Sequence, residues 1–293
     1  MEKYDEMKCG MFNNRSYFGY KSSVLKSGIC KYYRRELFYK FEWCVVEMMI
    51  MGSRNKAVMT NILNRLKILV MEEIVFDEIN VMVNCVNLLN MIEGEENWDK
   101  RVEYILEFCE VVRGCDRGRL VSYVNCWWKF YGEGEFEKEM SEVEIEKVKK
   151  YKKEGDDEEL LKMGELLIRY IENRDEKLVK VFGKMFDKEG KFGNRNKKKE
   201  GIYLFWEIVE DVMKKEDEEK LKNFMVIYKF GLEMFNRKKM NERRAFGVWI
   251  GMIVWKFDEM NWEVNAKKKN WNKESVVEYL RRRSKIVIER ILW

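Results

Sequence analysis

The sequence predicts an all-α protein, and three observations lead to this fold class. Apolar residues recur every three to four positions along most of the 293 residues, which is the spacing of one helix face. Strict alternation of apolar and polar residues is almost absent, so a β-sheet is not expected. The chain contains no Pro, and Gly, Asn and acidic residues therefore mark the ends of the predicted helices.

The N-terminal part is expected to consist of an irregular segment, 1–30, followed by helical hairpins over 31–132. Gly52, Gly94 and Gly114 each follow an apolar periodic stretch and are expected to end a helix. The predicted helices of this part are 31–51, 53–70, 77–92, 97–112 and 119–131.

A charged stretch, 133–159, is expected to be a hinge or linker, and 160–293 is expected to form further hairpins with a basic C-terminal region. Ser141 and Ser275 each precede a Glu by three residues, which is the spacing of a capping box. The predicted helices here are 141–153, 156–171, 175–186, 200–214, 217–236, 241–257 and 273–290. About twelve antiparallel helices favour an α-solenoid of stacked hairpins, with two helical bundles as the alternative.

The composition excludes much of the usual catalytic chemistry. The chain has no His and no Gln, one Thr and three Ala, and every codon for these residues and for Pro carries cytosine at its first or second position. A cytosine-poor coding strand accounts for this bias. Without His, the Ser-His-Asp and Cys-His pairs and His-ligated zinc are excluded, and no Gly-rich nucleotide loop occurs. We therefore expect no enzymatic activity, no cofactor and no metal.

Two chemistries stay open beside this expectation. The acidic run 156–159 could hold magnesium in an all-α enzyme, although acidic residues at a helix start are typical of capping. Cys115 is the best candidate nucleophile because it lies between Arg113 and Arg117, and nearby cations lower a thiol pKa. The alternative for Cys115 is a loop thiol with no chemical role.

Charge is unevenly distributed along the chain. The net charge is +5, but residues 237–293 contain 15 Lys or Arg and 7 Asp or Glu, so the first 236 residues sum to −3. The loop 190–199 combines two glycines with a run of cations, and the surface 237–285 combines cations with Trp, as in phosphate or RNA sites. The candidate nucleic-acid residues are Lys191, Arg195, Lys197, Lys198, Lys199, Lys267, Lys268, Lys269, Arg281, Arg282 and Arg283.

Trp127 and Trp128 are candidate residues of a protein interface. Adjacent helical positions point about 100° apart, so both rings cannot face one core, and an exposed Trp often anchors an interface.

The favoured function is a non-enzymatic scaffold or adaptor that binds a protein partner. RNA or other nucleic-acid binding is the alternative, and a magnesium-dependent helical enzyme comes third.

Compartment and membrane association follow from bulk properties. The seven Cys include no Cys-x-x-Cys pair and the count is odd, which indicates a reducing compartment, the cytoplasm or nucleus. The longest apolar run is too short to span a bilayer. We expect a soluble intracellular protein with no membrane contact, and we predict no particular oligomeric state.

Overall fold

The computed structural model describes residues 15–16, 18–53, 55–75, 78–127, 133–187, 200–237 and 240–260, without the side chains of 127, 133–134 and 240–242. Over these ranges the protein is all-α, with twelve α-helices and no strand, so the predicted fold class is confirmed. The stacking of the hairpins as a solenoid stays a prediction. No helix in the described ranges combines the length and hydropathy needed to cross a bilayer.

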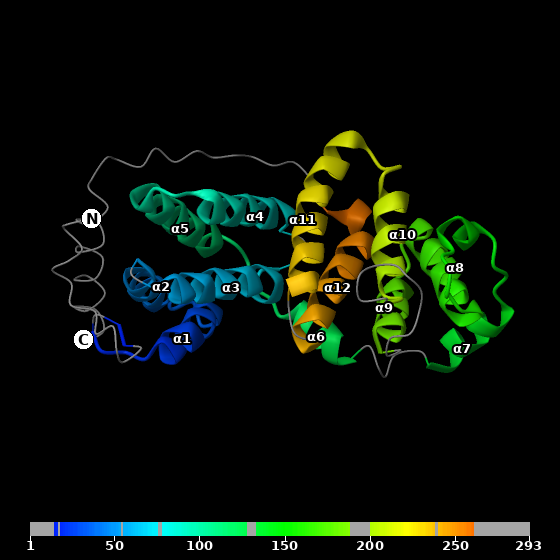
Figure 1. Cartoon of the computed structure of the whole chain (residues 1–293), viewed down its shortest axis with the longest axis horizontal. Coiled ribbons are helices and arrows are strands. Elements are labelled where there is room, and N and C mark those ends of the chain that lie inside the picture. Colours follow the sequence, from blue (N-terminus) through cyan, green and yellow to red (C-terminus); the bar gives the residue numbers. More distant parts are fainter. Residues whose placement is uncertain are drawn as a thin grey trace. The chain divides into compact units, whose positions relative to one another are not determined.

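The described residues divide into two compact units (Figure 1). Unit 1 lies within residues 15–118, and unit 2 consists of residues 119–260 together with 78–80. The helices of unit 1 are α1 Ser22–Arg34, α2 Phe38–Gly52, α3 Lys56–Glu73, α4 Ile79–Gly94 from residue 81 onward, and α5 Trp98–Arg113. Those of unit 2 are α6 Leu120–Trp127, α7 Glu133–Glu142, α8 Glu158–Glu172, α9 Lys177–Asp187, α10 Tyr203–Met213, α11 Glu218–Arg237 and α12 Met240–Trp255, with the 3-10 helices η3 Lys147–Tyr151 and η4 Phe257–Glu259.

The core of unit 1 begins with the α1–α2 hairpin, which also packs against α3. A Cβ atom on Gly28 of α1 would lie 2.7 Å from Cys44 Sγ of α2. A larger residue at this position would therefore displace the Cys44 side chain, and the two helices approach closely. Phe41 and Ile62 are fully buried where α2 and α3 meet.

The start of the chain differs from the prediction. The structure has two helices, α1 and α2, where one helix over 31–51 was expected, and residues 22–30 are helical rather than irregular. The turn between the helices is made by Glu36, whose φ of 59° lies in the left-handed region. No Gly or Pro marks this turn, so the two apolar patterns run together in the sequence.

Unit 2 is built around an aromatic core. The rings of Phe182 and Phe205 lie 4.7 Å apart and those of Trp206 and Phe235 lie 5.2 Å apart, between centroids. A Cβ atom on Gly247 of α12 would lie 1.9 Å from the Phe182 ring. This glycine therefore allows α12 to pack directly on α9.

The predicted hinge 133–159 contains ordered, packed structure. Ser141 belongs to the last turn of α7 and its hydroxyl donates to the carbonyl of Lys138 at 2.7 Å, so the predicted helix start at Ser141 is wrong. The Glu165 carboxylate of α8 accepts the backbone N–H groups of Glu146 and Val148 at 3.0 and 2.9 Å. Because Val148 is fully buried, η3 packs on α8, and the division between the units falls at residue 119.

Candidate binding surfaces

Most of the candidate residues predicted from the sequence lie outside the described residues. These are Lys191, Arg195, Lys197, Lys198, Lys199, Lys267, Lys268, Lys269, Arg281, Arg282, Arg283 and Trp128. Trp127 is the last residue of α6, and its side chain is also outside the description. The loop 190–199 therefore stays a prediction.

The described cations of the predicted basic surface 237–285 are held in ion pairs. Arg243 is buried, pairs with Glu200 at 2.6 Å and places its guanidinium 4.3 Å from the centroid of the Phe235 ring. The other pairs here are Arg237–Glu233, Arg244–Asp187 and Lys256–Glu259. These side chains stabilise unit 2 and present no unneutralised basic surface.

The acidic run 156–159 caps α8. Asp157 Oδ1 accepts the N–H of Leu160 at 2.7 Å, and Asp156 Oδ2 accepts the N–H of Lys153 at 2.8 Å. Acidic side chains in a first helical turn also interact favourably with the helix dipole. The capping interpretation is confirmed, and within the described ranges no three Cys, Asp or Glu side chains cluster in a way that could hold a metal ion.

Cys115 is a buried thiol in the core of unit 1. Its Sγ donates to the carbonyl of Val112 at 3.1 Å and lies 3.0 Å from the hydroxyl of Tyr33. The flanking cations are engaged elsewhere, Arg113 with Glu42 and Arg117 with Glu36. Because the thiol is 5% exposed, the arrangement gives no support to a nucleophilic role.

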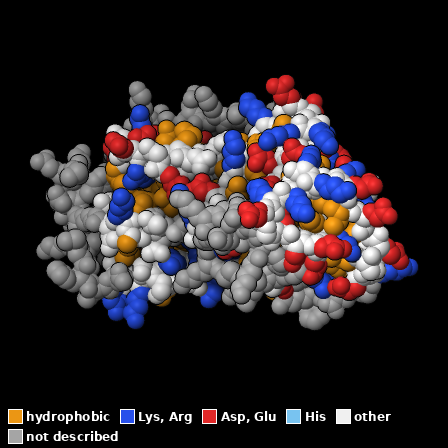
Figure 2. Space-filling model, turned by 45° about the vertical axis from the view of Figure 1, so that its right-hand side comes forward, with side chains coloured by type: hydrophobic (Ala, Val, Ile, Leu, Met, Phe, Trp, Pro, Cys, Tyr) orange, Lys and Arg blue, Asp and Glu red, His pale blue; other side chains and the backbone are white. Residues whose placement is uncertain are grey.

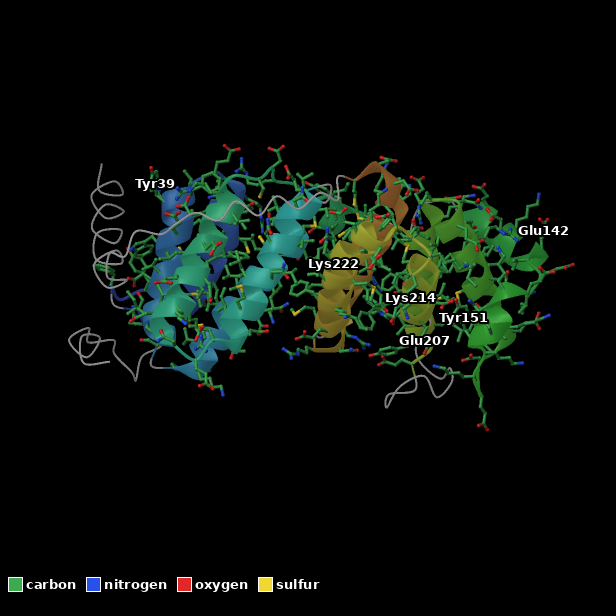
Figure 3. The ribbon with its side chains drawn as sticks, turned by 90° about the horizontal axis from the view of Figure 1, so that it is seen from above. Tyr39, Glu142, Tyr151, Glu207, Lys214 and Lys222 are labelled. Atoms are coloured by element: carbon green, nitrogen blue, oxygen red, sulfur yellow. The ribbon has the colours of Figure 1, made fainter. Side chains whose placement is uncertain are left out.

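A charged cluster joins η3 to α10 in unit 2. Asp211 accepts hydrogen bonds from Lys150 Nζ and Tyr151 Oη, both at 2.5 Å, and Glu207 pairs with Lys153. Figure 3 shows Tyr151 and Glu207 on the same side of the unit. The bond from Lys150 lowers the pKa of Asp211, while burial and the bond to Asp211 raise the pKa of Tyr151 to about 12. Each shift favours the form already present at neutral pH, so the cluster stabilises the fold and is unsuited to acid–base catalysis.

Helix α6 presents the first candidate surface, which we call the α6 face. It packs on α12, but among residues 120–126 only Val121 is buried. Leu120 is 44% and Tyr123 is 65% exposed. All eight residues of α6 are uncharged, although 37% of the chain is charged.

The second candidate surface, the cationic hairpin, consists of residues 15–40. This segment contains seven Lys or Arg and one Glu, a net charge of +6. It also carries five of the eight large apolar side chains that are exposed in the described ranges: Phe18, Tyr20, Val24, Leu37 and Tyr39. Sequence reasoning missed this surface because it summed charge over 236 residues, and a window of about 25 residues would have found it.

A short turn, residues 15–21, holds the aromatic side chains of the cationic hairpin in place. The Ser16 N–H donates to the Tyr20 carbonyl at 2.8 Å, and Gly19 adopts a φ of 81°. Beneath the turn, the buried Glu47 carboxylate accepts the N–H of Phe18 at 3.4 Å. The Tyr20 ring meets Trp43 of α2 edge-on, with centroids 4.8 Å apart.

Burial raises the pKa of Glu47, and hydrogen bonds from Ser16 and Phe18 oppose this rise. One carboxylate oxygen, Oε1, is buried with no hydrogen-bond partner among the described groups. Glu47 therefore orients the turn at some cost in desolvation.

No protein-family model, curated protein or solved structure matches this chain.

Proposed function

We propose that this protein is a non-enzymatic helical scaffold that binds a protein partner through the α6 face. The observation that carries the proposal is an uncharged helix with two strongly exposed apolar side chains, Leu120 and Tyr123, in a highly charged chain. Exposed apolar helix faces of this kind typically mark interaction sites.

The spacing along α6 suits a helix that inserts into a groove of its partner. Leu120 and Tyr123 are separated by three positions, and position 127 follows Leu120 by seven, so all three positions lie on one side of the helix. Anchors at i, i+3 and i+7 are the pattern of helix-in-groove recognition. Because α6 has no charged residue, the groove that accepts it is expected to be apolar.

The other functions receive less support. The acidic run that a magnesium enzyme would use serves as a helix cap, and the described cations of 237–260 are paired within unit 2. We therefore propose neither catalysis nor nucleic-acid binding from those regions.

The α6 face can be tested with a photoreactive amino acid at position 123 and a matched one at Lys222, which is also exposed in unit 2 (Figure 3). Crosslinking in the producing cells should give one discrete adduct from position 123 and none from 222. The partner captured in that adduct, once purified on its own, should bind the wild-type chain at least 10-fold more tightly than a Leu120→Asp variant. The reason is that the variant would place a charge in the apolar groove of the partner.

Three results would contradict the proposal. These are adducts from both positions alike, an adduct containing only a second copy of this chain, and unchanged affinity for the Leu120→Asp variant. Circular dichroism of the variant checks that unit 2 stays folded.

A further inference from the structure

We infer that the cationic hairpin of unit 1 is a binding surface for single-stranded nucleic acid. The surface combines Arg15, Lys21, Lys31, Arg35 and Lys40 with the exposed rings of Phe18, Tyr20 and Tyr39. This is a different surface from the α6 face, and the inference does not depend on the proposed scaffold function.

The cations of this hairpin are not neutralised by the fold. Arg34 pairs with Glu73 at 2.7 Å, but in the part of the chain that the structure describes, no carboxylate pairs with the other six cations, Arg15, Lys21, Lys26, Lys31, Arg35 and Lys40. The single acidic residue of the segment, Glu36, pairs with Arg117 of unit 1. A net charge of +6 therefore remains on a segment of 26 residues.

Helix stability explains only part of this charge. Lys31 and Arg34 lie in the last turn of α1, where a cation favours the helix dipole. Lys40 lies in the first turn of α2, where a cation opposes the dipole. Lys21 is the N-cap residue of α1 and makes no side-chain capping bond, so neither lysine is placed where it stabilises a helix.

The N-termini of α1 and α2 strengthen the positive potential. Neither helix has an acidic residue in its first turn or a side-chain cap at Lys21 or Leu37. The first N–H groups of a helix carry partial positive charge, and in these two helices no carboxylate of the first turn and no N-cap side chain offsets that charge. In contrast, Asn55 and Asn97 cap α3 and α5 of the same unit.

The outer cations share one side of α1. Lys31 and the C-cap residue Arg35 follow the helical spacing of the exposed side marked by Val24, whereas Leu25 and Ile29 are buried. The charges therefore point to solvent together, as phosphate contacts require.

The aromatic side chains lie near the start of α2, where Tyr39 is exposed and Trp43 is buried. Tyr39 precedes Trp43 by four residues, which is about one helical turn of 5.4 Å, and the rings of Tyr20 and Phe18 lie 4.8 and 6.4 Å from the Trp43 ring, between centroids. Phe18, Tyr20 and Tyr39 are each 40–45% exposed. The Arg113 guanidinium lies 5.9 Å from the centroid of the Tyr39 ring, and the exposed parts of the three rings offer surface on which bases can stack.

The combination favours single strands over the other polyanions. An acidic protein segment would be attracted by the charge but would gain little from three partly exposed rings. In duplexes the base faces are already stacked on one another, so a duplex offers phosphates without free faces. Single strands offer both phosphates and unstacked bases, and every base has an aromatic face, so no sequence preference is expected.

The test is fluorescence anisotropy with a labelled single strand of roughly 15 nucleotides, titrated with the full chain in salt from about 50 to 200 mM. With about four phosphate contacts, the affinity should fall roughly 50-fold over this range. The double variant Lys31→Ala/Arg35→Ala should bind about 10-fold more weakly, and its log–log salt slope should be smaller by about 1.4.

A matched control removes the same amount of charge from unit 2. Lys149 and Lys222 are exposed and form no ion pair among the described residues. Because neither lysine belongs to the cationic hairpin, Lys149→Ala/Lys222→Ala should leave the affinity within about twofold of wild type. Tyr20→Leu keeps an apolar contact with Trp43 but removes the ring. It should weaken binding about fivefold without changing the salt slope.

Four results would overturn the inference. No binding at about 50 mM salt would show that the hairpin does not bind single-stranded nucleic acid. Equal weakening of binding by both double variants would show that the affinity responds to net charge alone. Equal affinity for a duplex would show that the aromatic rings do not contribute by stacking on bases. Tighter binding of a poly-glutamate peptide than of the single strand, with the same loss in Lys31→Ala/Arg35→Ala, assigns the hairpin to an acidic protein instead.

Discussion

The cationic hairpin of unit 1 and residues 133–187 of unit 2 use charge in opposite ways. The hairpin has seven cations and one acidic residue, whereas residues 133–187 have 12 Lys or Arg and 17 Asp or Glu, a net charge of −5. In that part of unit 2, cations join elements, as Lys177 of α9 does by pairing with Glu135 and Glu139 of α7. Figure 2 shows Lys and Arg side chains interspersed with Asp and Glu over unit 2.

This difference separates structural charges from charges available to a ligand. A cation that already has a carboxylate partner must lose it before it can bind a phosphate, whereas Lys31 and Arg35 are open to solvent. Removing a cation that joins elements of unit 2 should therefore cost stability, and removing unpaired cations from the hairpin should cost binding.

Arg243→Ala should lower the free energy of unfolding of unit 2 by about 3 kcal/mol. The side chain is 6% exposed, and its removal leaves the Glu200 carboxylate without its guanidinium and the Phe235 ring uncovered. Urea unfolding followed by Trp fluorescence measures the change. A loss below about 0.5 kcal/mol would show that the buried pair contributes nothing net.

Arg174→Ala should lower the free energy of unfolding by about 2 kcal/mol. Arg174 joins three parts of unit 2, because it donates to Ile171 O, Glu216 and Asp258 at 3.1, 2.5 and 2.8 Å. Arg237→Ala is the control, since its pair with Glu233 is exposed and is expected to contribute less than about 0.5 kcal/mol. Equal effects of the two substitutions would contradict the role given to Arg174.

Glu47→Gln should stabilise unit 1 at neutral pH by about 1 kcal/mol, because no charge is then buried. Burial raises the pKa of Glu47 in the folded state, so the stability linked to its proton is present below the unfolded value of about 4.3 and is lost as pH rises through the folded pKa. The extra stability of Glu47→Gln should therefore appear as the pH rises through the folded pKa of Glu47, and it should vanish below the unfolded value of about 4.3. Thermal unfolding from acidic to neutral pH measures this, and a constant difference at all pH values would exclude the linkage.

Lys31→Ala/Arg35→Ala should change the free energy of unfolding by less than about 0.5 kcal/mol. Both side chains are exposed, and the small loss of a favourable dipole interaction at Lys31 is offset by the good helix propensity of Ala. Urea unfolding again provides the measurement. A loss comparable to that of Arg174→Ala would place these cations among the structural charges.

The sequence predicted the fold where local signals exist. Helices α3, α5, α8 and α11 lie close to the predicted ranges, because their apolar periodicity is bounded by Asn, Gly or acidic caps. It failed at Glu36, where a left-handed residue that is not Gly makes the turn, and at Ser141, where capping-box spacing occurs inside the end of a helix. These outcomes depend on tertiary packing rather than on local preference.

The candidate surfaces were harder to predict for a different reason. Whether a cation is available depends on partners distant in the sequence, as with Arg243 and Glu200, 43 residues apart. The interface role predicted for Trp127 and Trp128 from their adjacent positions stays a prediction, since neither side chain is among those described. The cationic hairpin is visible in the sequence as well, but only when charge is counted over a short window.

The most direct test of the separation of charges is to measure unfolding and single-strand binding together for Lys31→Ala/Arg35→Ala and for Arg174→Ala. We predict that the hairpin variant keeps its unfolding free energy to within about 0.5 kcal/mol and binds about 10-fold more weakly. Arg174→Ala should lose about 2 kcal/mol and bind, while folded, as wild type does. A hairpin variant that is destabilised but binds normally would contradict the account.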